Sequence, residues 1–226
     1  MVVYLYGPSW FHGIDTTFEI VSIVVSFLIF YFSYKTYKLT SQKKYLIFSI
    51  SFLLIAISFF FKIISNMIIY SKELQSNMIG MFTLYFYTIN RYEWFNFLSI
   101  FLYRFLMLIA FMIILLLCIK IKDKKLIAIL IYFIIISTLF SSSSYFIFNL
   151  TLAIVLGFIS YFYYHNYLNR KSKNSMIVAF SFIFIFISQL FFMFLIFSKG
   201  IYVLGEILQL FGYLLLLYTY ICIIRK

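Results

Sequence analysis

Residues 12–34, HGIDTTFEIVSIVVSFLIFYFSY, join a short polar segment to a long apolar run. His12, Asp15 and Glu19 are spaced by three and four residues, so on a helix they lie on one face. The residues that follow are predominantly apolar on every side, as in the segments of about 20 residues that cross a membrane. Glu19 is therefore expected inside the lipid bilayer, where a carboxylate needs a partner or a function.

The composition of the whole chain points to the same class of protein. The chain has 226 residues, of which 65% are hydrophobic and only 11% are charged, whereas a soluble domain carries about 25% charged residues. Apolar residues fill whole windows of about twenty residues instead of periodic stripes. We expect an all-α, polytopic membrane protein whose helices form one bundle in contact with the lipid bilayer.

The apolar runs predict seven transmembrane helices in a single domain. They cover residues 14–37, 45–70, 94–119, 126–140, 145–167, 176–197 and 201–223. Thirteen Lys and Arg residues follow the first, third, fifth and seventh helices, while the other loops hold only Lys72, Arg91 and Lys199. Because cytoplasmic loops are rich in Lys and Arg, we expect a cell-membrane protein with its N-terminus outside and its C-terminus in the cytoplasm. The net charge of +12 then reflects topology and contact with anionic lipids, and no nucleic acid partner is expected.

The external loop at 71–93 contains an aromatic, β-prone segment. Residues 81–89, MFTLYFYTI, follow Gly80 and precede Asn90. Such a segment is typical of a β-hairpin, which would form a lid over the outer mouth of the bundle, or of a segment that lies among the lipid headgroups. Periodicity does not separate these alternatives.

The chain also contains a candidate internal repeat. A shift of 130 residues gives eleven identities over positions 31–58, which places the first two helices on the fifth and sixth. The implied plan is three helices, a linker helix and three more helices in the same orientation, although two helical hairpins of similar composition also resemble each other by chance. The identities pair Tyr31, Phe32, Tyr34, Tyr37, Lys43, Ile47, Ser51, Phe52, Ile55, Ile57 and Ser58 with Tyr161, Phe162, Tyr164, Tyr167, Lys173, Ile177, Ser181, Phe182, Ile185, Ile187 and Ser188.

Strongly polar side chains inside the predicted helices fall in one layer, about 9 to 15 Å below the outer membrane surface at 1.5 Å per residue. As candidate ligand-binding residues this layer holds Glu19, Lys62, Asn66, Arg104, Gln189, Glu206 and Gln209, with His12, Asp15 and Glu93 at its mouth. Two acids and two bases at matched depth predict the pairs Glu19–Lys62 and Glu206–Arg104. One interpretation is an outward-facing polar pocket, because intramembrane charge usually marks function. The other is packing, in which polar contacts fix the positions of the helices.

Metal, cofactor and catalytic chemistry are not indicated. His12, Asp15 and Glu19 have side chains that bind metals, but a helix cap or a surface pair explains them better. Cys118 and Cys222 lie near the predicted cytoplasmic side, where a disulfide is not expected. We expect no metal, no organic cofactor and no enzyme activity, since no nucleophile–base pair is present.

The seven-helix plan resembles two membrane families. Glu93-Trp94 at the start of the third helix and the texture of residues 203–217, VLGEILQLFGYLLLL, resemble microbial rhodopsins, which implies a seven-helix bundle. Gln209 stands where that family has its retinal-binding lysine, so retinal attachment is contradicted. The three-one-three plan is similar to the SWEET/PQ-loop transporters, but their Pro-Gln pair is missing and Pro8, the only proline, lies outside the helices.

Three functions remain open from the sequence. The first is binding or sensing of a small polar solute or ion in the outer pocket, with a membrane or cytoplasmic protein partner at the basic inner loops. The second is transport of a small solute or ion through the same pocket. The third is a structural or accessory membrane subunit in which the polar layer only holds the helices together.

Overall fold

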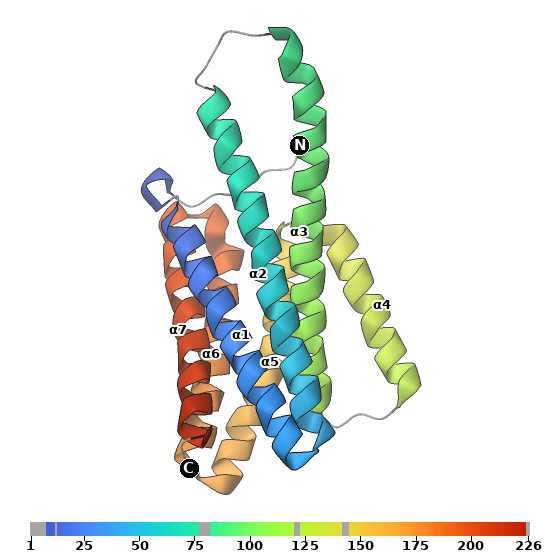
Figure 1. Cartoon of the computed structure of the whole chain (residues 1–226), viewed down its shortest axis with the longest axis vertical. Helices are drawn as coiled ribbons and strands as arrows, with labels where there is room; N and C mark the ends of the chain where they lie inside the picture. Colours follow the sequence, from blue (N-terminus) through green and yellow to red (C-terminus); the bar gives the residue numbers. More distant parts are fainter. Residues whose placement is uncertain (1–7, 12, 77–81, 120–122, 142–144, 225–226) are drawn as a thin grey trace.

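The protein is an all-α bundle. The computed structural model describes residues 8–11, 13–76, 82–119, 123–141 and 145–224. The expected all-α class is confirmed, and each predicted helix overlaps one observed helix. The helices are α1 (Ile14–Thr40), α2 (Lys43–Ser76), α3 (Phe82–Ile119), α4 (Lys124–Ser141), α5 (Tyr145–Arg170), α6 (Lys173–Met193) and α7 (Lys199–Ile224), with short 3-10 helices at Ser9–Phe11 and Phe194–Ile196 (Figure 1).

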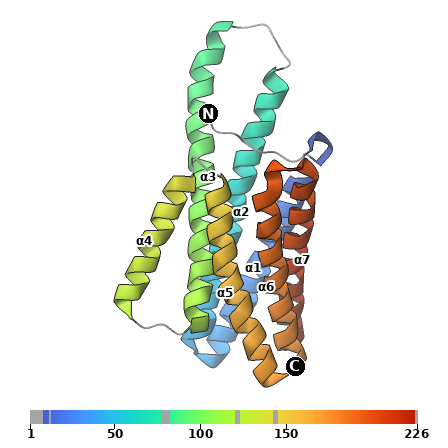
Figure 2. The ribbon, with the colours of Figure 1, turned by 180° about the vertical axis from the view of Figure 1, so that it is seen from behind.

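Six of the helices form a closed ring. Consecutive helices pack together within α1–α2–α3 and within α5–α6–α7, and the two groups meet where α3 packs on α5 and α7 packs on α1. Helix α4 lies outside this ring against α3 and α5, as the front and back views show (Figures 1 and 2). The polar side chains that the sequence places in one layer can therefore meet in the interior of this ring.

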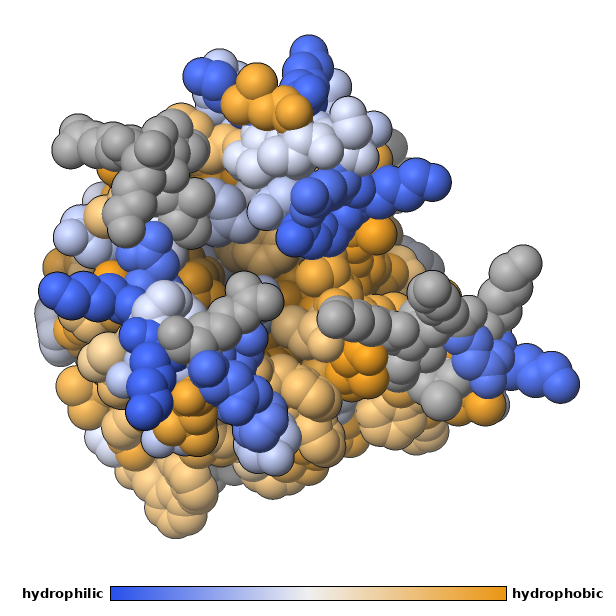
Figure 3. All heavy atoms as spheres, turned by 90° about the horizontal axis from the view of Figure 1, so that it is seen from below, coloured by the Kyte–Doolittle hydropathy of each residue, from blue (hydrophilic) through white to orange (hydrophobic). Residues whose placement is uncertain are grey.

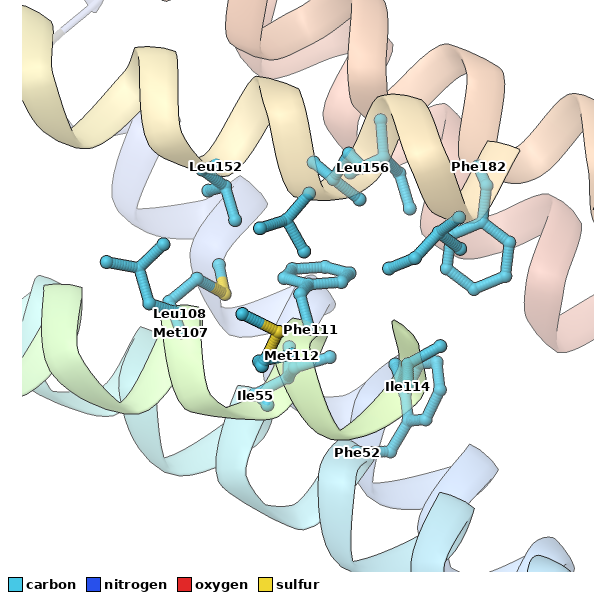
Figure 4. Packing of buried hydrophobic residues seen from close by; sticks show 14 of the residues in the cluster. Phe52, Ile55, Met107, Leu108, Phe111, Met112, Ile114, Leu152, Leu156 and Phe182 are labelled. Carbon is cyan, nitrogen blue, oxygen red and sulfur yellow. The ribbon is translucent and has the colours of Figure 1, made fainter. Parts of the chain in front are cut away.

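The apolar core fills the ring between α2, α3, α5 and α6. Phe52 on α2, Phe111 on α3 and Phe182 on α6 are at most 1% exposed. Figure 4 shows the side chains of α3 directed toward Leu152 and Leu156 of α5. Burial of such side chains is worth about 1.5–3 kcal/mol each when they leave water, although in a bilayer packing contributes more than the loss of water does.

Within the described residues, six helices are long and apolar enough to cross a membrane, namely α1, α2, α3, α5, α6 and α7. Helix α4, the expected seventh span, does not meet this length, because its apolar segment, Ile127–Ser141, has fewer than 18 residues. Large apolar side chains such as Phe27, Phe133 and Phe158 are more than half exposed on the outside of the bundle, as expected for surfaces that face lipid.

The predicted β-hairpin at 81–89 is wrong for the part of this segment that the structure describes. Helix α3 already begins at Phe82, twelve residues before the predicted start, and α2 continues to Ser76. Residues 82–93 contain no Gly or Pro to interrupt the helix that follows, and β propensity depends on a neighbouring strand that is not available here. Figure 1 shows α2 and α3 extending together beyond the rest of the bundle.

Two of the interhelical turns have the same geometry. Ser41, after α1, and Lys171, after α5, both have positive φ values, 54° and 49°. The backbone N–H of each donates to the carbonyl of a tyrosine four residues earlier, Tyr37 or Tyr167, at 2.8 and 2.7 Å. This left-handed closure satisfies carbonyl groups at a helix C-terminus. The two turns are 130 residues apart.

The basic residues gather at one end of the molecule. The turns α1–α2 and α5–α6, the start of α4 and the C-terminus all lie at this end (Figures 1 and 2). Figure 3 looks onto it and shows hydrophilic side chains standing out from an apolar body. Exposed lysines here, which we call the basic end, include Lys38, Lys43, Lys44, Lys125, Lys171 and Lys173.

Candidate functional site

The start of α1 is organised by Asp15. Its Oδ1 accepts hydrogen bonds from the backbone N–H groups of Gly13 at 3.0 Å and of Thr16 at 2.7 Å. Gly13 has a φ of 90°, which suits a residue without a side chain. Asp15 is only 2% exposed and stabilises the helix start through the favourable interaction of a carboxylate with a helix N-terminus.

One turn further on, Glu19 begins the central charged cluster. Its carboxylate is fully buried, and Oε1 lies 3.0 Å from Nζ of Lys62. The same Nζ lies 2.6 Å from Oε1 of Glu206. Asn66 donates from Nδ2 to Oε1 of Glu19 at 2.8 Å. Side chains from α1, α2 and α7 thus meet at a single ammonium group.

The predicted Glu19–Lys62 pair is present, but the Glu206–Arg104 pair is wrong. Lys62, not Arg104, contacts Glu206. Arg104 donates from Nη1 to the backbone carbonyl of Ser141, the last residue of α4, and its guanidinium lies 5.7 Å from the ring centre of Phe148. The position of α4 outside the ring explains this, because a cation at a helix C-terminus is favourable and α4 ends beside α3.

Aromatic rings surround the ammonium group of Lys62. Its Nζ lies 5.9 Å from the ring centres of Phe59 and Tyr103 and 6.0 Å from that of Phe192. These are cation–π distances, and the interaction strengthens when water is excluded. Only 13% of the lysine side chain is exposed. The charge is therefore held by two carboxylates and three ring faces.

A second aromatic group covers the cluster on the side of the N-terminus. Phe11, 2% exposed, lies 6.0 Å from Tyr202 and 5.7 Å from Phe18 between ring centres. Phe192, on α6, lies 5.8 Å from Tyr202. Sequence reasoning missed Phe11 and Tyr202, since the chain has 32 Phe and 21 Tyr residues and nothing in their spacing marks these two.

The remaining amides of the predicted layer are buried but separate. Gln189, on α6, is 2% exposed and donates from Nε2 to Oγ of Ser188 at 3.3 Å. Gln209, on α7, is also 2% exposed, and its amide lies beside the phenol of Tyr213, one turn further along the helix. Gln209 lies three residues after Glu206, so both face the same side of α7.

The side chains of two residues predicted for the mouth of the pocket lie outside the described part of the structure. His12 is not among the described residues, and of Glu93 only the backbone, within α3, is described. The described part of the layer consists of Glu19, Lys62, Asn66 and Glu206 in one cluster, with Gln209 beside it and Arg104 and Gln189 at separate positions.

The charges of the cluster do not balance when all three groups are ionised. Two carboxylates face one ammonium, which leaves one negative charge in a region of low dielectric constant. The second oxygen of Glu19, Oε2, has no hydrogen-bond partner within the described part of the chain. An uncompensated buried charge costs several kcal/mol, on the order of 3–5, so the arrangement favours uptake of one further positive charge.

No protein-family model, curated protein or solved structure matches the chain. Its function is therefore argued from the geometry of this cluster.

Proposed function

We propose that the chain is a seven-helix membrane protein that binds a small cation at the Glu19–Lys62–Glu206 cluster. The observation that carries the proposal is the contact of one ammonium with two buried carboxylates, at 3.0 and 2.6 Å. A proton, a small metal cation or a small amine would supply the missing positive charge. This narrows the polar solute or ion expected from the sequence to a cation.

The convergence of three helices favours binding over packing alone. A pair of side chains is sufficient to fix two neighbouring helices, whereas this cluster adds a second carboxylate and the amide of Asn66. Oε2 of Glu19, for which the described residues supply no hydrogen-bond partner, is a further acceptor for a ligand. The packing interpretation remains the second candidate, because polar contacts between helices also stabilise membrane proteins by about 1 kcal/mol each.

We also propose that α4 is the seventh span and that the basic end is cytoplasmic. Helix α3 ends at the basic end and α5 begins at the opposite end (Figures 1 and 2). The connecting α4 has 18 residues, or about 27 Å, close to the hydrocarbon thickness of about 30 Å. The positive-inside rule then places the N-terminus outside and the C-terminus inside the cell membrane.

A protease site added after Lys226 tests this orientation. We expect cleavage in inside-out vesicles and protection in intact cells. Cleavage from outside intact cells would show that the orientation is the reverse of the proposed one. The Glu19–Lys62–Glu206 cluster would then lie near the cytoplasmic surface.

The proposed internal repeat has additional support from matched details. The turns after α1 and α5 lie 130 residues apart. Two pairs of buried serines, one member of each pair in either half of the chain, have the same separation. Ser51 and Ser181 donate to the carbonyls of Ile47 and Ile177, at 3.0 and 2.7 Å. Ser58 and Ser188 donate to the carbonyls of Ile55 and Ile185, each at 2.7 Å. The order of helices around the ring is the one expected from two related groups of three.

In such a repeat the two halves differ at the site. Asn149 on α5 occupies the position that corresponds to Glu19, and Phe192 the position that corresponds to Lys62. The charged cluster thus belongs to one half only. Whether the cation is sensed through a protein partner at the basic end or transported is decided by flux measurements, since both uses require the same cluster.

Replacement of Glu19 by glutamine tests cation binding. The purified protein in detergent should unfold at a higher temperature in sodium or lithium chloride than in choline chloride of equal ionic strength, or at lower pH if the ligand is a proton. A cation at ten times its Kd adds about 1.4 kcal/mol of stability. Glu19→Gln should lose this dependence, because it removes the uncompensated charge.

The matched control is Asp123→Asn, which neutralises an exposed carboxylate at the start of α4. This variant should keep the cation or pH response. A wild-type protein whose unfolding temperature is insensitive to all small cations and to pH would leave the cluster with a packing role only.

A further inference from the structure

A polar interface runs down the bundle from the acid cluster. Helices α1 and α7 pack against each other and run in the same direction (Figures 1 and 2). One stripe of residues on each helix defines what we call the α1–α7 seam. The seam is defined by the residues at helical steps of three and four from the two glutamates: Glu19, Ser22, Ser26, Ile29 and Ser33 on α1, and Glu206, Gln209, Tyr213, Leu216 and Tyr220 on α7.

The register of the seam is set at both ends. Glu19 and Glu206 lie at one level, because both contact Nζ of Lys62. Fourteen residues later on each helix, the phenol of Tyr220 lies beside the hydroxyl of Ser33. Parallel helices with facing residues at steps of three and four keep their partners level. The same periodicity predicts Ser22 near the level of Gln209, Ser26 near that of Tyr213, and Ile29 near that of Leu216. The ring of Tyr213 also packs on Phe59 of α2, with the ring centres 5.5 Å apart.

Four of these five levels are polar, and their polar groups are buried. Within the described chain, Oε2 of Glu19 and Oγ of Ser26 have no hydrogen-bond partner. The amide of Gln209 lies beside the phenol of Tyr213, and the hydroxyl of Ser33 beside that of Tyr220. By contrast, Ser22, Ser51 and Ser181 each donate to a carbonyl of their own helix. Buried polar groups are usually satisfied, and water molecules are the usual partners where protein groups do not suffice.

The opposite interface shows that the bundle does not need a polar seam for packing. Helices α3 and α5 pack together on the far side of the ring. There Leu108, Leu152 and Leu156 are fully buried among apolar neighbours (Figure 4). In the proposed repeat, α3–α5 corresponds to α7–α1. At the equivalent position in the other half of the repeat, leucine side chains are therefore sufficient to pack the two helices together.

We propose that the α1–α7 seam is a proton path from the Glu19–Glu206 pair to the basic end of the bundle. A proton binds a carboxylate oxygen, and at each later step one O–H bond forms at the acceptor as another breaks at the donor. Water molecules between the hydroxyl, phenol and amide groups carry the proton from level to level. The path covers 14 residues, or about 21 Å along the helices.

The level of Ile29 and Leu216 is the gate of this path. Both side chains are fully buried and apolar. They separate the phenol of Tyr213 from that of Tyr220, which lies one heptad, or about 10 Å, further along α7. An apolar constriction limits conduction because it excludes water.

Proton flux into liposomes containing the whole protein tests the path. A potassium gradient with valinomycin sets the membrane potential, and an internal pH dye reports proton entry. We expect flux above that of protein-free liposomes. Tyr213→Phe should lower it about tenfold or more, because the relay group is removed, and Leu216→Ser should raise it, because all five levels become polar.

The matched control is Tyr163→Phe, which removes a phenol on α5 outside the seam. It should leave the flux unchanged, and the unfolding temperature of each variant verifies folding. Wild-type flux equal to that of empty liposomes, sodium flux without proton flux, or a Tyr213→Phe flux equal to wild type would each overturn the path. An unchanged flux in Leu216→Ser would overturn the gate.

The inference rests on the proposed function only in that the cation site forms the upper end of the seam. The two fail differently. Cation-dependent stability that requires Glu19, without proton flux, retains the site and removes the path. Proton flux that requires Tyr213 but persists in Glu19→Gln retains the lower seam and contradicts the role of the acid pair.

Discussion

Replacing Lys62 by methionine is expected to cost about 3–5 kcal/mol of unfolding free energy, the largest loss of any single substitution considered. Methionine keeps the length of the side chain but removes the charge shared by Glu19 and Glu206. Two carboxylates, 0% and 4% exposed, would then face each other without a cation. Thermal unfolding in detergent measures the loss.

Two comparisons isolate the electrostatic cause. Lys199→Met removes an exposed lysine at the start of α7 and should change stability by less than about 0.5 kcal/mol. Addition of Glu19→Gln and Glu206→Gln to Lys62→Met should recover much of the lost stability, because neutral groups replace the unpaired charges. If Lys62→Met is as stable as the wild type, the carboxylates do not depend on this ammonium.

Gly212→Ala is expected to destabilise the protein by about 2 kcal/mol through the interface between α6 and α7. A Cβ atom at Gly212 would lie 2.5 Å from Cγ1 of Ile185 and 2.9 Å from the backbone oxygen of Ser181. The isoleucine side chain can rotate, but the backbone oxygen moves only with α6. Small residues permit such close helix contacts in membrane proteins.

Gly157→Ala is the matched substitution in α5. Its Cβ would meet the side chain of Phe186 at 3.4 Å, an ordinary contact. Since alanine is a better helix former than glycine by about 1 kcal/mol, this variant should be neutral or more stable. The difference between the two variants in unfolding temperature measures the cost of separating α6 from α7. Equal stabilities would mean that the two helices can move apart freely.

The helices and the approximate layer of polar residues could be predicted from the sequence, because both depend on local patterns. Apolar windows predict helices that cross a membrane, and residue counts along a helix predict depth. Glu19 is buried as expected, whereas Asp15, which was predicted for the mouth of the pocket, is also buried. The segment at 81–89 was predicted as a hairpin or an interfacial segment, but its described part, from Phe82, is helical. Aromatic residues suit strands and helices alike, and only the neighbouring structure decides between them.

Partner choice within the layer could not be predicted in the same way. Lys62 and Arg104 lie at similar depth, so depth alone permits either base to contact Glu206. The ring order decides this, because α7 closes on α1 and brings Glu206 to the cluster formed by Glu19 and Lys62. The guanidinium of Arg104 is instead used at the end of α4.

The sequence by itself determined that the chain is all-α, that its helices are apolar enough for a bilayer and that Glu19, Lys62 and Glu206 lie at similar depths along their helices. Those properties follow from composition and from the rise of a helix per residue. Only the tertiary structure decided that two carboxylates share one ammonium and that the phenol of Tyr220 lies beside the hydroxyl of Ser33. Such contacts join residues that are far apart in the sequence, and their geometry depends on which helices are neighbours and on their relative register.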